Sequence, residues 1–167
     1  LEQKRLDQAE RIFTALTAEA PEIPVGHFRL GVVYTLKKQY DKARSALDAV
    51  LDLEPGHMQA FRQVIQVLVL QSNTDGAIAK CDDFINILDD ASTEQAMVLS
   101  LKGELLFKQS RVPEAEKTYK EALTKDPDLL SSYHGLARLY LYAQKPDEAI
   151  RQYEAALARN PKAKELH

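Results

Sequence analysis

The 167-residue sequence predicts an all-α protein built from repeated helical hairpins, and three observations lead to this prediction. Alanine and leucine supply 44 residues, whereas valine, isoleucine and threonine supply 23, a bias toward side chains that lose little freedom in a helix. One residue pattern returns about every 34 positions. Within each period, apolar residues recur twice at the spacing of a single helix face.

The period is set by alanines and by the helix stops that follow them. The alanines are spaced by 34, 34, 38 and 34 residues: Ala9, Ala43, Ala77, Ala115 and Ala149. Twelve residues after them come, in order, Pro21, Pro55, Asp89, Pro127 and Pro161. Because proline disfavours the helical region in the residue before it, four of the five periods end at a helix stop. We therefore expect repeats at 24–57, 58–91, 92–129 and 130–163, preceded by the second helix of a truncated repeat in 1–23 and followed by a tail in 164–167.

Each repeat is expected to hold two helices, called A and B below, whose apolar faces meet. The A helices are expected to bury His27, Leu30, Gly31 and Tyr34; Phe61, Val64, Ile65 and Leu68; Leu99, Gly103 and Leu106; and Tyr133, Leu136, Ala137 and Tyr140. The B helices are expected to bury Ala43, Leu47 and Val50; Ala77, Cys81 and Phe84; Ala115, Tyr119 and Ala122; and Ala149, Tyr153 and Ala156. Small residues in these faces let the two helices approach closely. Pro113 and Pro146 lie where a helix tolerates proline, at its start.

The third complete repeat departs from the period. Asp89 stands where the other repeats have proline, and four extra residues, 92–95, follow. Ser92 and Gln95 have the spacing of a capping box, in which a serine side chain caps the first turn of a helix. We expect the insertion to add one turn to the A helix of 92–129, and we expect the array to bend at this boundary.

These motifs resemble the tetratricopeptide repeat (TPR) family, whose pattern reads W-x2-L-G-x2-Y…A-x3-F…P over 34 residues. The repeat 24–57 matches it with Leu30, Gly31, Tyr34, Ala43, Leu47 and Pro55, and the repeat 130–163 with Tyr133, Leu136, Ala137, Tyr140, Ala149, Tyr153 and Pro161. The resemblance covers about residues 6 to 163. Tryptophan is absent, and Lys102 occupies the usual leucine position. The resemblance implies a right-handed α-α superhelix, a TPR solenoid of antiparallel hairpins, with the A helices lining its concave groove.

The two ends of the sequence lack the helices that complete and cap a repeat array. Residues 6–20 are expected to form a B helix without a preceding A helix, and too few residues follow Pro161 for the polar capping helix that repeat arrays use. We expect the chain to be an excerpt from a longer array whose terminal apolar faces are partly unpaired.

The sequence contains no arrangement that predicts catalysis, a metal site or a cofactor site. Its four histidines have no partners at metal-ligand spacing, and no glycine-rich phosphate loop occurs. Cys81 takes a core position, so a buried, inert thiol is favoured over a nucleophile. The net charge of −3 argues against nucleic acid, and no apolar stretch is long enough for a membrane span. We therefore expect no enzyme activity and no cofactor.

The resemblance implies that a peptide binds to the exposed stripe of the A helices. Taking the second, fifth, ninth and twelfth residue of each repeat, and skipping the insertion, gives Val25, Phe28, Val32, Thr35, Gln59, Arg62, Gln66, Val69, Met97, Ser100, Glu104, Phe107, Ser131, His134, Arg138 and Leu141. About half are large and apolar at positions that the hairpin core does not need. These fit a groove that buries apolar anchors of a partner, although packing against a neighbouring B helix would also account for them.

Charge is unevenly divided between the two kinds of helix. The A segments 24–38, 58–71, 92–110 and 130–144 contain seven lysines or arginines and two glutamates, a net charge of +5, which leaves −8 for the rest. An acidic partner attracted to Arg62 and Arg138 would account for this. The helix dipole is an alternative cause, because Lys37, Lys38 and Lys108 fall at A-helix ends while acidic residues open B helices. Arg62 and Arg138 are not explained by the dipole.

We conclude from the sequence that the chain is a non-catalytic scaffold that binds a peptide or protein segment with acidic and apolar groups. One alternative is a spacer or self-associating module that acts, as a homo-oligomer, through uncapped ends; another is a helical repeat that binds RNA. A chaperone-tail clamp is disfavoured, because no asparagine lies on an A helix. By analogy, degenerate arrays without tryptophan suggest a bacterial protein, soluble in the cytoplasm or periplasm.

Overall fold

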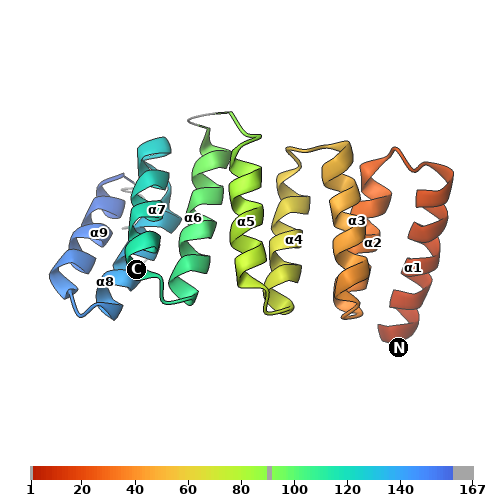
Figure 1. The fold of residues 1–167 in the computed structure, drawn as a ribbon, viewed down its shortest axis with the longest axis horizontal. Coiled ribbons are helices and arrows are strands. Elements are labelled where there is room, and N and C mark those ends of the chain that lie inside the picture. Colours follow the sequence, from red (N-terminus) through yellow and green to blue (C-terminus); the bar gives the residue numbers. More distant parts are fainter. Residues whose placement is uncertain (1, 90–91, 160–167) are drawn as a thin grey trace. The chain divides into compact units, whose positions relative to one another are not determined.

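The computed structural model describes residues 2–89 and 92–159, and all of the regular secondary structure in these ranges is helical (Figure 1). The helices are α1 (Glu2–Glu19), α2 (Pro24–Leu36), α3 (Tyr40–Leu53), α4 (Met58–Leu70), α5 (Thr74–Ile85), α6 (Thr93–Lys108), α7 (Val112–Lys125), α8 (Leu130–Tyr142) and α9 (Pro146–Arg159). The all-α prediction is confirmed. Even-numbered helices are the A helices, and odd-numbered helices are the B helices.

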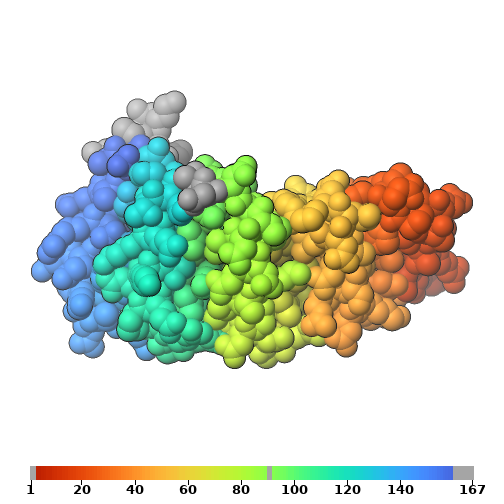
Figure 2. Space-filling model, turned by 45° about the horizontal axis from the view of Figure 1, so that its top comes forward, coloured from red at the N-terminus to blue at the C-terminus, as the bar shows by residue number. Residues whose placement is uncertain are grey.

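The chain divides into two compact units, Leu1–Lys80 and Cys81–His167, with the division inside α5. In the first unit α1 packs on α2, α2 on α3 and α3 on α4. In the second unit α6 packs on α7, α7 on α8 and α8 on α9, and the A helices α6 and α8 also touch. Within each unit, helices that follow one another in the sequence therefore lie side by side, as the succession of colours across the space-filling surface shows (Figure 2).

Each A helix buries more of its surface than the hairpin pattern predicts. Leu30 and Gly31 are buried as expected, while His27 and Tyr34 are half-buried. The structure also buries the third and tenth residue of each repeat, counted without the insertion 92–95, which the prediction missed: Gly26, Ala60, Val98 and Ser132, and Val33, Val67, Leu105 and Leu139. The physical reason is that α2 contacts both α1 and α3, and α8 both α7 and α9, so an A helix is covered on two sides.

The predicted B-helix core is confirmed for three of the four repeats. Tyr119 is 2% exposed, and its ring fills the space left by Gly103 of α6 and Gly135 of α8. In α9 only Ala149 is buried, whereas Tyr153 is 40% exposed and Ala156 half-buried, so this part of the prediction is wrong. The reason is that, among the described residues, α9 packs on α8 and has no following helix.

Proline sets most helix boundaries as the sequence predicts. Helix α3 ends two residues before Pro55 and α7 two residues before Pro127, while Pro113 and Pro146 lie in the first turns of α7 and α9. Pro161 lies outside the described residues. Helix α1 begins at Glu2, about one turn earlier than the predicted 6–20.

The insertion before α6 adds a helical turn, as predicted. Helix α6 has 16 residues, against 13 in α2, α4 and α8. Ser92 Oγ accepts a hydrogen bond from the Gln95 backbone N–H at 3.0 Å. The Gln95 side chain instead donates to the Ile85 carbonyl at 3.4 Å, so the structure shows the serine half of the predicted capping box.

Two histidines have structural roles. His27 Nε2 lies 2.8 Å from the Pro21 carbonyl, as the Tyr133 hydroxyl lies 3.0 Å from the Pro127 carbonyl in the last hairpin. A carbonyl oxygen only accepts, so His27 Nε2 carries a proton here and replaces the tyrosine hydroxyl of the other repeat. His57 caps α4, because its Nδ1 accepts the Ala60 N–H at 3.1 Å.

Each A helix of the described chain is followed by a residue with a left-handed backbone. Lys38, Ser72, Ser110 and Gln144 have φ between 57° and 61° and repeat at the period of the array. A non-glycine residue in this region costs about 1–2 kcal/mol through crowding of its Cβ. Replacing Ser110 with glycine is therefore expected to raise the free energy of unfolding by up to about 1 kcal/mol in urea denaturation. The matched control is Ser110→Ala, which keeps the Cβ and should show no such gain.

A lysine at the end of α2 holds α1 in place. Lys37 is 10% exposed at its side chain; its Nζ donates to Asp7 Oδ1 at 2.7 Å and also pairs with Glu10. The hydrogen bond from Lys37 lowers the pKa of Asp7 below its ordinary 3.8. Hydrogen bonds to Asp7 and then Glu10 raise the pKa of Lys37 above 10.5.

These shifts predict a pH dependence for the first unit. The contribution of Asp7 is present above its unfolded pKa and is lost as pH falls through its folded pKa, because the folded value is the lower one. The contribution of Lys37 is complete below 10.5 and is lost as pH rises through its raised folded pKa. Urea unfolding at a series of pH values should show wild type more stable than Lys37→Met between these limits, with the difference vanishing at both ends. A difference independent of pH would contradict the role of the ion pair.

Candidate functional site

The predicted stripe lies outside the hairpin cores of both units. Its exposed members are Val25, Gln59, Arg62, Gln66, Met97, Ser131, His134, Arg138 and Leu141. Its half-buried members are Phe28, Val32, Thr35, Val69, Glu104 and Phe107. Ser100 is the exception, because it is buried and shares a hydrogen bond of 2.9 Å with Ser131, which ties α6 to α8.

The stripe continues at a position that the sequence analysis missed. The thirteenth residue of an A helix lies one turn beyond the ninth, on the same face. Leu36, Leu70 and Tyr142 occupy it in three repeats and are among the exposed large apolar side chains, and Lys108 occupies it in the repeat with the insertion. The i, i+4 spacing from Val32, Gln66 and Arg138 was the available signal. We call the stripe together with these three residues the A-face.

In the first unit, the A-face combines an aromatic stack with an unneutralised cation. The rings of Phe28 and His57 are 5.6 Å apart and nearly parallel, so the residue that caps α4 also supports Phe28. Arg62 is exposed and forms no ion pair with the described part of the chain. The Thr35 hydroxyl donates to the Gly31 carbonyl at 2.9 Å within its own helix. Phe28 and Arg62 are therefore the side chains of this face best placed to meet a partner.

In the second unit, three side chains of the A-face touch one another. The guanidinium of Arg138 lies over the Phe107 ring, 5.7 Å from its centre. The Tyr142 ring meets the Phe107 ring edge-on, with centres 5.5 Å apart. Next to them, Lys108 Nζ and Glu104 Oε1 form an ion pair at 3.2 Å. At the other end of the face, His134 Nδ1 lies 3.5 Å from the Tyr153 hydroxyl.

The structure shows where part of the positive charge of the A segments lies. Lys37 pairs with α1, and Lys102 pairs with Asp82 of α5 at 2.5 Å. Lys108 is paired with Glu104. The unneutralised cations of the A-face are therefore Arg62 and Arg138.

Cys81 occupies the core, as predicted, and its side chain is fully buried. Burial first, and the nearby Asp82 second, raise the pKa of the thiol to about 12, so the thiolate is scarce at neutral pH. Within residues 2–89 and 92–159, histidine, cysteine and acidic side chains form no group of three that could hold a metal ion. In the same ranges, none of the helices combines the length and apolar character needed to cross a bilayer.

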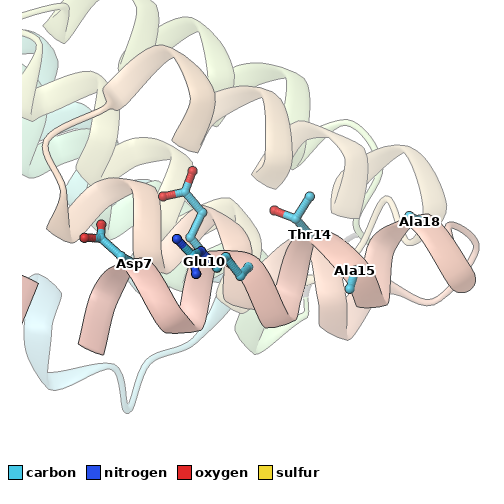
Figure 3. A pocket seen from close by; sticks show the side chains of 6 residues that line it. Asp7, Glu10, Thr14, Ala15 and Ala18 are labelled. Carbon is cyan, nitrogen blue, oxygen red and sulfur yellow. The ribbon is translucent and has the colours of Figure 1, made fainter. Parts of the chain in front are cut away.

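Two hollows of the first unit lie away from the A-face. One, of about 580 Å³, runs along α1 between Asp7 and Ala18 (Figure 3). The other, of about 550 Å³, is lined by α1, α2 and α3, including Tyr34 and Lys42, whose Nζ lies 5.4 Å from the centre of the Tyr34 ring. Neither hollow contains a residue of the A-face, and Asp7 is already paired with Lys37.

The chain consists of stacked helical hairpins, and its A helices expose a partly apolar face. These features are typical of helical repeat proteins. The family comparison agrees, because two tetratricopeptide repeat profiles match this chain, over residues 1–68 and 94–162. The chain belongs to the tetratricopeptide repeat family, and its fold is an all-α TPR solenoid.

Solved structures with the same fold share little sequence with this chain. A chain of MamA from Desulfovibrio magneticus, solved from residue 41 to the end, aligns with a TM-score of 0.71 at 16% identity, covering 97% of this chain and 89% of the solved one. YrrB, described as a TPR protein with an unusual peptide-binding site, aligns with a TM-score of 0.64 at 18% identity, covering 99% and 86%. PilF from Pseudomonas aeruginosa aligns with a TM-score of 0.70 at 15% identity, covering 96% and 71%.

A curated human protein, the protein O-mannosyl-transferase TMTC3, is 21% identical over 177 aligned positions. The match covers 97% of this chain and 19% of TMTC3, so the chain spans about a fifth of that protein's length.

Proposed function

We propose that this chain is a non-catalytic protein-interaction module that binds a peptide or protein segment on its A-face. The observation that carries the proposal is the exposure of apolar side chains on A helices, outside the hairpin core. Val25, Met97 and Leu141 are 50%, 41% and 53% exposed. Large apolar side chains left exposed among polar residues are typical of surfaces that bind protein segments.

The side chains of the A-face favour a partner with both acidic and apolar groups. Phe28 and Phe107 are half-buried and supply apolar contact, and Arg62 and Arg138 supply positive charge that the described chain does not neutralise. An apolar anchor supplies most of the binding free energy in such contacts, and a charged neighbour adds register and specificity.

Two of the similar proteins support the proposal that this chain is an interaction module within a larger protein. YrrB is described as having a peptide-binding site, and the human relative is much longer than this chain. We propose that the chain serves as part of a larger multi-repeat protein, with repeat limits at 57/58, 91/92 and 129/130. A bacterial setting remains part of this proposal; the structures from Desulfovibrio and Pseudomonas share the fold with this chain, and the curated sequence match is human.

The test is capture of a partner from a lysate of the source organism, with the bound proteins identified by mass spectrometry. Wild type is compared with a variant in which Phe28, Arg62, Phe107 and Arg138 are replaced by alanine. We expect the variant to lose the partner while circular dichroism shows unchanged helix content.

The matched control replaces four exposed B-helix residues, Arg44, Lys117, Glu121 and Arg151, with alanine and should capture the same partner as wild type. Retention of the partner by the A-face variant would show that a different surface binds it.

Self-association is the second candidate, and one observation favours it. Ile12 of α1 and Ile150 of α9 are both more than half exposed, on helices that lack a neighbour on one side within the described chain. The candidate predicts that light scattering shows a mass rising with concentration, and that Ile12→Glu or Ile150→Glu abolishes the rise. A monomer at all concentrations would eliminate it.

A further inference from the structure

The second unit holds a cation that is oriented by its surroundings but not neutralised by them. Arg138 lies over Phe107, and Phe107 is in turn held edge-on by Tyr142. Contact with an aromatic face restrains the planar guanidinium and leaves its N–H edge open to a ligand. We call Phe107, Arg138, Leu141 and Tyr142 the Arg138 cluster.

The acidic side chain of the A-face, Glu104, already has a partner. Glu104 is paired with Lys108 at 3.2 Å, and Arg138 forms no ion pair with the residues that the structure describes. A paired glutamate and lysine leave little net charge beside the cluster. The positive charge of Arg138 is therefore available to an anion from outside, and the geometry of a guanidinium favours a carboxylate held by two hydrogen bonds.

Apolar surface lies directly beside this cation. Leu141 and Tyr142 follow Arg138 on the last turn of α8 and are 53% and 64% exposed. A ligand whose carboxylate reaches Arg138 can rest an adjacent apolar or aromatic group on these side chains. The cluster thus offers a positive charge at Arg138 and apolar contact one helical turn away, at Leu141 and Tyr142.

The other A helices of the chain do not repeat this combination. At the ninth position, where α8 has Arg138, the residues are Val32, Gln66 and Glu104. At the twelfth position, where α6 has Phe107, they are Thr35, Val69 and Leu141. The pairing of a cation with an aromatic ring at these positions belongs to α6 and α8 alone, so it marks a local preference and not a feature of the repeat.

We propose that the Arg138 cluster is a binding subsite for an acidic peptide segment, in which a carboxylate pairs with Arg138 and a neighbouring apolar side chain packs on Leu141 and Tyr142. The proposal rests on the proposed function, because it names the partner chemistry of one part of the A-face. It makes Arg138 the residue that selects a carboxylate over an uncharged group of the same shape.

The experiment uses small probes that carry the two halves of the predicted ligand. Phenylacetate, 2-phenylacetamide and acetate are titrated into the isotope-labelled protein, and backbone amide shifts are followed by NMR. We expect phenylacetate to shift amides of residues 103–109 and 134–143 with a Kd of about 1–10 mM, as fragments of this size allow. The uncharged amide and the ringless acetate should each bind about tenfold more weakly.

Variants then assign the effect to the cluster. Arg138→Gln should weaken phenylacetate binding about tenfold, and Phe107→Leu should weaken it several-fold because the guanidinium loses its restraint. Arg151→Gln, which removes an exposed arginine of α9 in the same unit, is the matched control and should leave the Kd unchanged. Arg138→Gln changes an exposed residue, and Phe107→Leu replaces one apolar side chain by another, so neither should disturb the fold. Unchanged amide spectra in the rest of the protein verify this.

Three results would overturn the proposal. Phenylacetamide binding as tightly as phenylacetate would show that charge plays no part, and wild-type affinity in Arg138→Gln would show that the residue is wrong. Equal shifts with inorganic phosphate would show an unspecific anion site, as expected of a nucleic-acid surface instead of an acidic-peptide one. The two experiments separate failure of the subsite from failure of the proposed function. If capture from a lysate depends on the A-face but phenylacetate does not bind, the subsite proposal is wrong and the proposed function stands. If phenylacetate binds as expected but capture does not depend on the A-face, the proposed function is wrong and the subsite proposal stands.

Discussion

Replacing Tyr119 with alanine is expected to lower the free energy of unfolding by about 3–5 kcal/mol, the range for a fully buried aromatic side chain. Tyr119 is 2% exposed, and its ring lies against two glycines from different hairpins. An ideal Cβ would lie 2.9 Å from the ring at Gly103 and 2.4 Å from it at Gly135. The ring therefore occupies the space between α6 and α8, and its removal leaves a cavity that borders both hairpins of the second unit.

Urea denaturation followed by circular dichroism measures this loss. Tyr153→Ala is the matched control, because Tyr153 stands at the same position in α9 but is 40% exposed, and it should cost about 1 kcal/mol or less. The double variant Tyr119→Ala with Gly135→Ala should be more stable than the sum of the two single changes predicts, since the added methyl enters the space that the ring leaves. Equal losses for Tyr119→Ala and Tyr153→Ala would contradict this account of the packing.

Replacing Gly31 with leucine is expected to lower the free energy of unfolding by about 1–3 kcal/mol through overpacking in the first unit. Gly31 of α2 faces Leu47 of α3, which is fully buried. An ideal Cβ on Gly31 would lie 2.6 Å from Leu47 Cγ and 3.3 Å from the Ala43 carbonyl oxygen. The first contact is too short for real atoms, and the backbone carbonyl cannot move aside without moving α3, so the two helices must separate.

The control for this change is Gly56→Ala in the turn before α4. An ideal Cβ at Gly56 meets no heavy atom within 4 Å, and no glycine of the described chain has positive φ, so alanine fits there. The free energy of unfolding should change by no more than about 0.5 kcal/mol. An unchanged melting temperature for Gly31→Leu would mean that the A and B helices are not aligned as the structure has them.

Much of the hairpin was predictable, because its determinants lie within one repeat. The alanine period, the prolines after B helices and the Ser92 cap all act on the backbone within a few residues. The burial of Leu30 and Leu47 follows from helical spacing alone. By contrast, the buried third and tenth residues of the repeats, counted without the insertion, were missed, although they lie two helical turns apart and the tenth is apolar in all four repeats. In α2, α4 and α8 the A helix also packs on the preceding B helix, and a pattern that considers only the hairpin partner does not include this contact.

The candidate surface was predictable in its location but not in its chemistry. The stripe of the A helices emerges outside the core from Val25 to Leu141, and its extension to Leu36, Leu70 and Tyr142 follows the same face by one more turn. The net charge of +5 counted over the A segments does not describe that face, because part of this charge lies elsewhere. Lys37 directly follows α2 and Lys102 lies on α6, yet their long side chains reach carboxylates of B helices, which a count along the sequence does not show.

The amino-acid sequence by itself determined that this chain is a series of helical hairpins of the tetratricopeptide repeat type, because period, helix propensity and proline stops act locally and repeat. Only the tertiary structure decided which side chains meet across repeats. It placed Tyr119 between Gly103 and Gly135, paired Lys37 with Asp7, and left Arg138 over Phe107 without an acidic partner in the described chain. The physical reason is that these contacts depend on the three-dimensional approach of helices from neighbouring repeats, on which local spacing carries no information.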